Sequence, residues 1–147
     1  MDFEIRSFVA DDKSEVLPMM EVFYSSDAVF TNGSKEIFEK DFETALSDSP
    51  YLEGYVFTAN SKILGYSLLA KSFSTEFGKL CIWLEDLYLK SEYRGHGIIP
   101  TFIKYVENKY ADAILRLEVE DENEHAVHVY EKAGFSRLPY VEMKKEV

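Results

Sequence analysis

Cysteine is nearly absent from this sequence: the chain of 147 residues has one, Cys81. A single cysteine excludes an intramolecular disulfide. Because Cys81 lies among apolar residues, we expect it to behave as a small buried hydrophobe and not as a catalytic thiol.

Long apolar runs are also missing. The longest, such as Leu80 to Leu84, are broken by charges within a few residues and fall well short of the roughly 20 residues that span a bilayer. The first residues, Met1 to Arg6, lack the basic start and the apolar block of a secretory signal. We therefore expect a cytoplasmic protein without a membrane span.

Basic residues are scarce. Lysine and arginine number 16 against 27 aspartate and glutamate residues, so the formal net charge is −11. This excess of carboxylates argues against a nucleic-acid partner, whose phosphates it would repel. The same field would concentrate cationic small molecules, although solubility alone also explains an acidic protein. The hydrophobic content of 46% is enough for one substantial core, so we expect a single domain over residues 1–147.

The first third of the sequence predicts one strand and two helices. Apolar residues at three- and four-residue spacing run from Val16 to Tyr24 and from Ile37 to Leu46, the pattern of amphipathic helices. Asn32 to Ser34 separate the two helices, and Pro18 lies within the first turn or two of the first one. The strand before them covers Phe3 to Val9.

The rest of the sequence predicts a run of strands and then alternating helices and strands. Three segments rich in branched and aromatic residues predict an antiparallel meander over Tyr55 to Ala59, Ile63 to Ala70 and Leu80 to Leu89. After them we expect a helix, a strand, a helix and two short closing strands, over Gly97 to Tyr110, Ala113 to Val119, Asn123 to Ala133, Phe135 to Leu138 and Tyr140 to Lys144. This order implies a mixed sheet with helices on its faces, an α/β layout.

The turn that leads into the helix at Gly97 has the features of an anion site. The first N–H groups of a helix have no partner within it and carry the positive end of its dipole, so they can hold a phosphate. Gly95 and Gly97 allow close approach, while Arg94 and His96 can add cationic hydrogen bonds. The alternative interpretation of residues 94–97 is an ordinary strand-to-helix turn that binds no anion. The dinucleotide fingerprint and the nucleoside triphosphate loop are excluded, because the glycines and the Gly-Lys-Ser or Gly-Lys-Thr step that they need are missing.

Three blocks follow one another along the chain: Trp83 to Leu89, Arg94 to Ile99, and Leu117 to Phe135. In that order they resemble the fourth strand, the coenzyme A loop and the C-terminal motif of the GNAT superfamily of N-acetyltransferases. Tyr140 to Lys144 also resembles its last strand. The resemblance covers nearly the whole chain. It implies the GNAT fold, an α+β arrangement whose mixed, mostly antiparallel sheet has about six or seven strands.

The resemblance implies acetyl-CoA as the donor and assigns residues to it. The backbone of Leu87, Tyr88 and Leu89 would face the pantetheine arm, and Asn123 would bind the arm from the other side. The Tyr130 phenol would lie near the coenzyme A sulfur, where the departing thiolate needs a proton or a hydrogen bond. Packing between helix and sheet is the alternative role for Tyr130. The pyrophosphate would be held by Arg94, Gly95, His96, Gly97, Ile98 and Ile99.

The coenzyme A loop departs from the family pattern at one point. Ile99 stands where glycine or alanine is usual, and Pro100 follows it with no N–H to offer, so we expect one phosphate contact to be altered. Lys132 could meet the 3′-phosphate of the coenzyme, although a solvated helix face explains it equally well.

An amine acceptor requires a proton acceptor, because a free alkylamine has a pKa near 10.4 and must lose a proton before it attacks. The resemblance to the fourth strand of polyamine and diamine acetyltransferases makes Glu85 the leading candidate, with a structural carboxylate as the alternative. Strand alternation would place Glu85 and Asp86 on opposite faces. Tyr24 and Asp27 belong to an aromatic and acidic segment that would suit a primary amine or polyamine. Protein N-termini, lysines, amino-sugar antibiotics and amino acids also remain open as acceptors.

The predicted activity is direct transfer of an acetyl group from acetyl-CoA to an amine within a ternary complex. The alternatives are a non-catalytic acyl-CoA-binding module, a protein N-terminal or lysine acetyltransferase, and a bare interaction domain. His125 and His128 lie three residues apart with no third ligand at a recognised zinc spacing, so we expect no metal. Members of the family often dimerise, and the sequence leaves a homodimer open.

Overall fold

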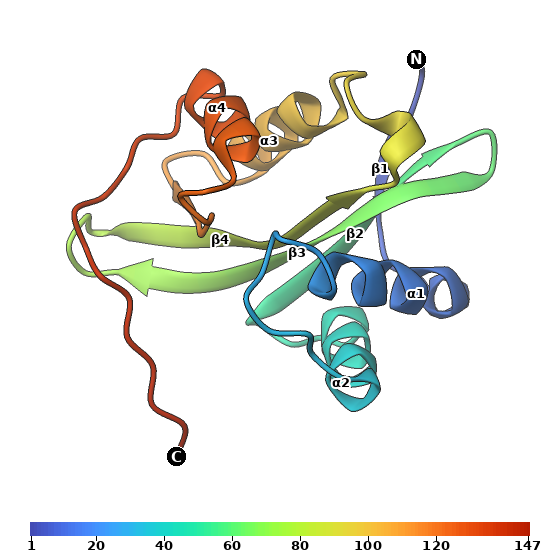
Figure 1. Cartoon of the computed structure of the whole chain (residues 1–147), viewed down its shortest axis with the longest axis horizontal. Helices are drawn as coiled ribbons and strands as arrows, with labels where there is room; N and C mark the ends of the chain where they lie inside the picture. Colours follow the sequence, from blue (N-terminus) through green and yellow to red (C-terminus); the bar gives the residue numbers. More distant parts are fainter.

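The computed structural model describes residues 1–147 (Figure 1). Its elements in chain order are β1 (Glu4–Ser7), the 3₁₀ turn η1 (Ala10–Asp12), α1 (Lys13–Tyr24), α2 (Lys35–Leu46), β2 (Leu52–Ala59), β3 (Lys62–Ser74), β4 (Lys79–Leu89), the 3₁₀ turn η2 (Ser91–Tyr93), α3 (Ile98–Lys109), β5 (Ile114–Leu117) and α4 (Glu124–Lys132). None of these helices combines the length and the apolar character that crossing a bilayer requires.

One mixed sheet forms the middle layer, with strand order β1-β2-β3-β4-β5. The first four strands pair antiparallel, and β5 runs parallel to β4. Asn60 and Ser61 make the turn between β2 and β3 in the left-handed conformation, at φ 51° and 63°, as a two-residue hairpin requires. Helices α1 and α2 cover one face of the sheet and α3 and α4 the other (Figure 1), so the prediction of helices on both faces is confirmed.

Each face of the sheet carries its own hydrophobic core. Phe42 belongs to the core beneath α1 and α2, and Phe102 to the core beneath α3 and α4; both are fully buried. Successive residues of a strand pack alternately into the two cores, because their side chains point to opposite faces of the sheet. Val56 on β2 packs into the first core and its neighbour Phe57 into the second.

An ion pair between the partly exposed Arg6 and the buried Asp12 fixes the start of α1. The carboxylate of Asp12, which is 4% exposed, accepts hydrogen bonds from both terminal nitrogens of Arg6, at 2.8 and 2.9 Å, and from the backbone N–H of Val9 at 2.8 Å. These bonds join β1 to the helix that follows it. Helix α1 then continues without interruption through Pro18.

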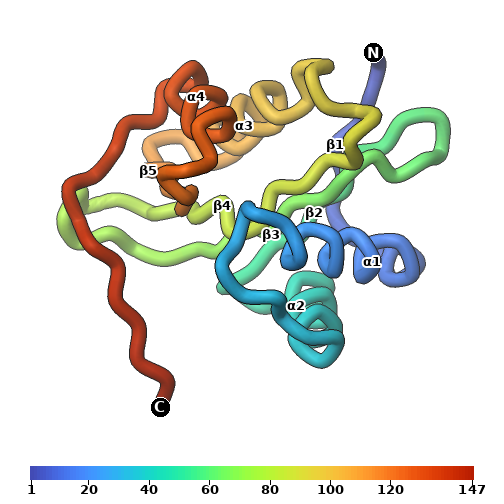
Figure 2. Tube along the Cα trace, viewed as in Figure 1, coloured from blue at the N-terminus to red at the C-terminus, as the bar shows by residue number.

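The sheet has five strands, so the prediction of six or seven was wrong. The two expected closing strands, Phe135 to Leu138 and Tyr140 to Lys144, belong to a tail that is neither helix nor strand and that runs past the tip of the β3–β4 hairpin (Figure 2). Val141 and Met143 on this tail are 88% and 92% exposed. Their alternation with charged residues is typical of a strand, but a strand also needs a partner, and β5 pairs only with β4. The predicted strand at Ala113 to Val119 is shorter than expected and covers only the four residues of β5.

Candidate active site

A β-bulge interrupts β4 at Glu85. Leu84 is opposite Leu69 of β3 and Asp86 is opposite Leu68, so Glu85 has no partner between them. A bulge shifts the alternation of side chains by one residue. Leu84 accordingly packs beneath α3 and α4, whereas Asp86 reaches toward α1 on the opposite face. The simple alternation assumed for this strand does not continue across the bulge.

Strands β4 and β5 separate at this bulge. Their parallel pairing joins Cys81 to Leu84 with Ile114 to Leu117 and goes no further. Strand β4 continues to Leu89, paired there only with β3, so its other edge has no strand partner. Leu87 and Tyr88, half-buried, and Leu89, buried, occupy this unpaired stretch. The three residues predicted to face a pantetheine arm therefore lie on an open strand edge.

The start of α3 presents a row of unpaired donors. No backbone N–H of residues 95–99 donates a hydrogen bond within the protein; the first helical bond runs from the Thr101 N–H to the Gly97 carbonyl, at 3.1 Å. Gly95 and Gly97 both have φ 79°, a left-handed conformation that other residues adopt only under strain. Pro100 is the third helical residue, so it removes one donor from the row. The remaining N–H groups fit an anionic phosphate.

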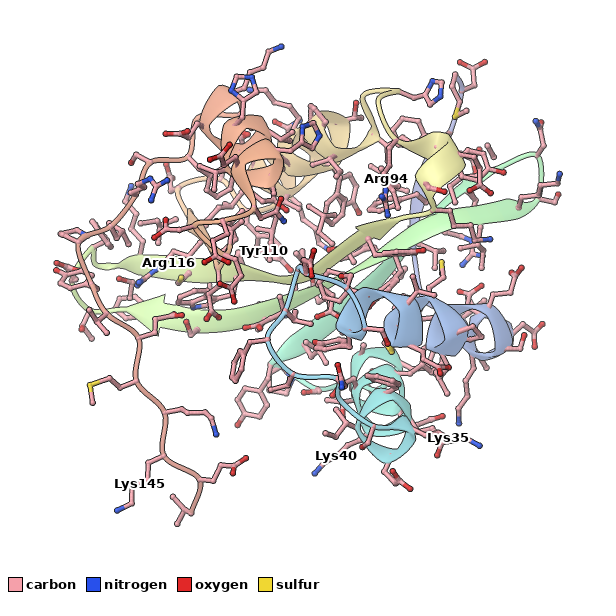
Figure 3. All side chains as sticks on the ribbon, viewed as in Figure 1. Lys35, Lys40, Arg94, Tyr110, Arg116 and Lys145 are labelled. Atoms are coloured by element: carbon pink, nitrogen blue, oxygen red, sulfur yellow. The ribbon has the colours of Figure 1, made fainter.

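The two cationic residues of this loop have different surroundings. Arg94 Nε donates to the carbonyl oxygen of Leu89 at 3.1 Å, and its guanidinium lies 6.0 Å from the centre of the Tyr88 ring. Figure 3 shows the Arg94 side chain just above the sheet, beside the end of β4. Arg94 thereby ties the loop to the open strand edge. His96 is exposed and makes no hydrogen bond within the protein.

Tyr130 lies on α4 with its hydroxyl unpaired. Its half-buried ring packs against the core beneath α3 and α4. No buried side-chain oxygen in the protein lacks a hydrogen-bond partner, so the unpaired Tyr130 hydroxyl is open to solvent. Burial raises the pKa of Tyr130, so the phenol remains protonated and able to donate at neutral pH.

The two ends of α4 hold the other predicted donor-site residues. Asn123 caps the helix, with its Oδ1 accepting the N–H of Ala126 at 3.3 Å, and its amide NH₂ makes no bond within the protein. Lys132 is exposed at the other end. His125 and His128 are exposed between them, and no group of three His, Cys, Asp or Glu side chains is arranged to hold a metal ion.

On the opposite face, Asp86 is buried beneath two phenols. The Tyr24 hydroxyl donates to its Oδ1 at 2.7 Å and the Tyr66 hydroxyl to its Oδ2 at 2.8 Å, while Ser67 Oγ donates to its backbone carbonyl at 2.7 Å. The Tyr24 hydroxyl is therefore engaged with the protein. Asp27, the other predicted acceptor residue, is exposed in the segment between α1 and α2 and makes no hydrogen bond through its side chain.

Further carboxyl groups surround this region. Burial, and then the nearby Asp86, raise the pKa of Asp41 on α2 to about 6. Desolvation, and then the charges of Asp86, Glu142 and Asp41, raise the pKa of Glu85. A hydrogen bond with Glu142 raises the pKa of Glu118 to about 7. These carboxyl groups have no basic partner in an ion pair, so the region is acidic, and the raised pKa values show that they compete for the same protons.

Asp41, Tyr66 and Asp86 were not predicted as parts of this region. For Asp86 there was a signal, since a carboxylate inside an otherwise apolar strand needs hydrogen-bond partners if it is buried. Tyr66 and Asp41 gave no signal that distinguished them from a core tyrosine and a solvated helix residue.

The family model for the acetyltransferase (GNAT) family matches residues 18–135. The chain belongs to this family. Two curated relatives are thialysine N-epsilon-acetyltransferases: that of Bos taurus is 41% identical over 83 residues, which is 54% of this chain and 48% of the relative. That of Sus scrofa is 40% identical over 85 residues, 56% of this chain and 49% of the relative. The aligned part thus spans about half the length of these GNAT relatives. The prediction of the family is confirmed, and the expected enzyme class agrees with that of its curated relatives.

Solved structures show the same GNAT fold. A "possible acetyltransferase" from Clostridium difficile 630 superposes with a TM-score of 0.81 at 22% identity, covering 99% of this chain and 97% of the other. The aminoglycoside N-acetyltransferase AAC(6')-Iy, solved with a coenzyme A bisubstrate analogue, superposes at 0.78 with 15% identity, over 100% and 99%. A "predicted acetyltransferase" from Clostridium acetobutylicum, solved with acetyl-CoA, superposes at 0.78 with 16% identity, over 97% and 96%.

Proposed function

We propose that this GNAT protein transfers the acetyl group of acetyl-CoA directly to the amino group of a small cationic amine. The observation that carries the proposal is the conjunction of unpaired N–H groups at the start of α3 with the unpaired edge of β4. The first suits the pyrophosphate of coenzyme A. The second offers backbone donors and acceptors to the amide groups of a pantetheine arm.

In the proposed reaction, the neutral amine attacks the thioester carbonyl carbon. A C–N bond forms, the C–S bond breaks, and the electron pair leaves with the coenzyme A sulfur. The Tyr130 phenol, unpaired and protonated, donates a proton or a hydrogen bond to that sulfur. No covalent enzyme intermediate is required, because donor and acceptor are bound together.

Glu85 is the proposed proton acceptor for the amine, directly or through water. Its position at the bulge places it where β4 and β5 separate, and its side chain is exposed. Its raised pKa makes it a better base than an ordinary carboxylate, since the ideal catalytic pKa lies near the working pH.

The proposed acceptor is cationic because the region beside Glu85 is acidic. Asp41, Asp86 and Glu118 are further carboxyl groups there, and such an acidic cluster favours a protonated amine over an anionic or apolar acceptor. Similar proteins include acetyltransferases of thialysine and of aminoglycosides. We favour a small-molecule amine such as a polyamine, with protein N-termini and lysines as the alternative acceptors.

Calorimetric titration with acetyl-CoA tests the donor first, with ATP and NAD as controls. We expect saturable binding that is selective for acetyl-CoA. Absence of binding at millimolar acetyl-CoA would contradict the proposal. Amines are then screened for release of free coenzyme A thiol, with diamines and polyamines compared against acidic amino acids and a lysine-containing peptide.

The missing N–H of Pro100 favours one alternative, an acyl-CoA-binding module without turnover. Such a module would bind acetyl-CoA in the titration but release no thiol with any amine. Thiol release above the rate of hydrolysis in the absence of amine would rule it out.

A further inference from the structure

Asp86 is a buried carboxylate without a cationic partner. It is 1% exposed and forms no ion pair, so its charge is balanced only by the hydroxyls of Tyr24 and Tyr66. Burial of a carboxyl group without a counter-charge is costly. An apolar residue could occupy this buried strand position without the desolvation cost of a carboxylate. The contacts of Asp86 therefore indicate what its carboxylate does.

The two phenols that reach Asp86 come from different places. Tyr66 lies on β3, which is already hydrogen-bonded to β4 along its length, so its hydroxyl adds no new connection between elements. Tyr24 is the last residue of α1, and its hydroxyl joins that helix to β4 at the residue that follows the bulge. Its ring also lies 5.4 Å, centre to centre, from that of Phe38 on α2. Tyr24 thus connects three elements.

The segment that Tyr24 anchors connects α1 to α2 and carries Asp27. Residues 25–34 contain no helix or strand. The contacts of Tyr24 at the N-terminal end of this segment therefore help to determine its position relative to Glu85. The other ionisable groups facing Asp86 are Asp41 on α2 and Glu85 on β4; both are acidic and cannot replace the phenol donors.

We infer that Asp86 is a positioning residue for the acceptor amine: through the Tyr24 hydroxyl it holds the end of α1 and the start of the 25–34 segment in place beside Glu85. This inference rests on the proposed function for its effect on turnover. The Tyr24–Asp86 bond itself does not depend on that function. Asp86 does not contact the reacting atoms in this assignment, because its carboxylate is enclosed by the two phenols.

Tyr24→Phe and Tyr66→Phe form a matched pair of test variants. Each removes one hydroxyl and one hydrogen bond of nearly equal length to the same carboxylate, at 2.7 and 2.8 Å. Only Tyr24→Phe removes a hydrogen bond between the end of α1 and β4. We expect Tyr24→Phe to raise the KM for the amine about tenfold, since a hydrogen bond to a charged group is lost at the anchor. Tyr66→Phe should change this KM by less than about twofold, and the Kd for acetyl-CoA should stay unchanged in both variants.

Hydrogen exchange of the backbone amides provides a second measurement, independent of turnover. Residues 25–34 should exchange faster in Tyr24→Phe than in the wild-type chain and remain unchanged in Tyr66→Phe. Asp86→Leu, which is similar in shape and has no oxygen to accept the Tyr24 hydroxyl, should resemble Tyr24→Phe in both measurements. It also serves as the second variant if Tyr24→Phe folds poorly, as judged by thermal melting.

Equal effects of Tyr24→Phe and Tyr66→Phe on the exchange of residues 25–34 would overturn the inference, whether or not the protein has activity. If the wild-type chain transfers no acetyl group, the proposed function fails while the exchange comparison still decides the anchoring role. If transfer occurs and the two variants share the same amine KM, the proposed function stands and the positioning role is refuted.

Discussion

The ring of Tyr130 meets the ring of Phe135 edge to face, with their centres 5.9 Å apart. Phe135 packs against the core beneath α3 and α4 and lies just beyond the end of the helix that carries Tyr130. This contact holds the tyrosine ring through its apolar face and leaves the hydroxyl unpaired. Packing and proton donation are therefore compatible roles for one side chain.

Replacing Tyr130 with phenylalanine separates these two roles. The packing is kept and the hydroxyl is lost, so we expect kcat to fall about a hundredfold while the thermal midpoint and the Kd for acetyl-CoA stay close to those of the wild type. Steady-state kinetics and calorimetry on the same preparation measure both quantities. Unchanged turnover would assign Tyr130 to packing alone.

Glu85→Gln tests the proposed base. Loss of the carboxylate should lower kcat/KM about a hundredfold and remove the acidic limb of the pH–rate profile, because that limb reports the protonation of the base. Glu15→Gln, at an exposed carboxylate near the start of α1, is the control for a change of one charge. A variant with normal kinetics but a lower melting temperature would show that Glu85 is structural.

Gly97→Ala tests the phosphate cradle, with Gly78→Ala as its partner. Both glycines have positive φ, 79° and 63°, and a Cβ at either would meet no atom within 4 Å. Backbone strain should therefore lower the free energy of unfolding by a similar amount in both, about 1 kcal/mol. Only Gly97→Ala should weaken acetyl-CoA binding, because Gly78 lies in the β3–β4 turn. Equal donor affinities in the two variants would argue against a phosphate at this loop.

Asp41→Asn tests the carboxyl cluster through stability. The pKa of Asp41 is about 6 in the folded protein, above the value of about 3.9 for an unperturbed aspartate. The folded state therefore binds more protons than the unfolded state between these values, and stability decreases as the pH rises through this window. Asp41→Asn should melt at a higher temperature than the wild type at pH 7.5, and the difference should disappear near pH 4.

Asp48→Asn, at an exposed carboxylate just beyond α2, controls for the change in net charge. A stabilisation of Asp41→Asn that is equal at pH 4 and pH 7.5 would contradict a shifted carboxyl group at position 41.

Features that depend on local structure could be predicted from the sequence, whereas features that depend on the pairing of strands or of distant residues could not. The helix after Gly97 and the three meander strands followed from periodicity and turn residues, because these patterns depend on local structure. The bulge at Glu85 could not be found this way, since it is defined by the register of β4 against β3. For the same reason the alternation of Val141 and Met143 predicted a strand that has no partner here. The Tyr24–Asp86 bond joins residues 62 positions apart, which no local pattern reports.

The separation of the hydrophobic interior into two cores has a consequence for how such a protein can change over evolutionary time. Substitutions in residues that contact different cores affect stability nearly independently, because distant sites share no partners. Phe42 and its neighbours beneath α1 and α2 can therefore be replaced without disturbing Phe102 on the other face. A lineage can in this way alter the α1–α2 half, which carries the proposed acceptor residues Tyr24 and Asp27, while it inherits the α3–α4 half unaltered.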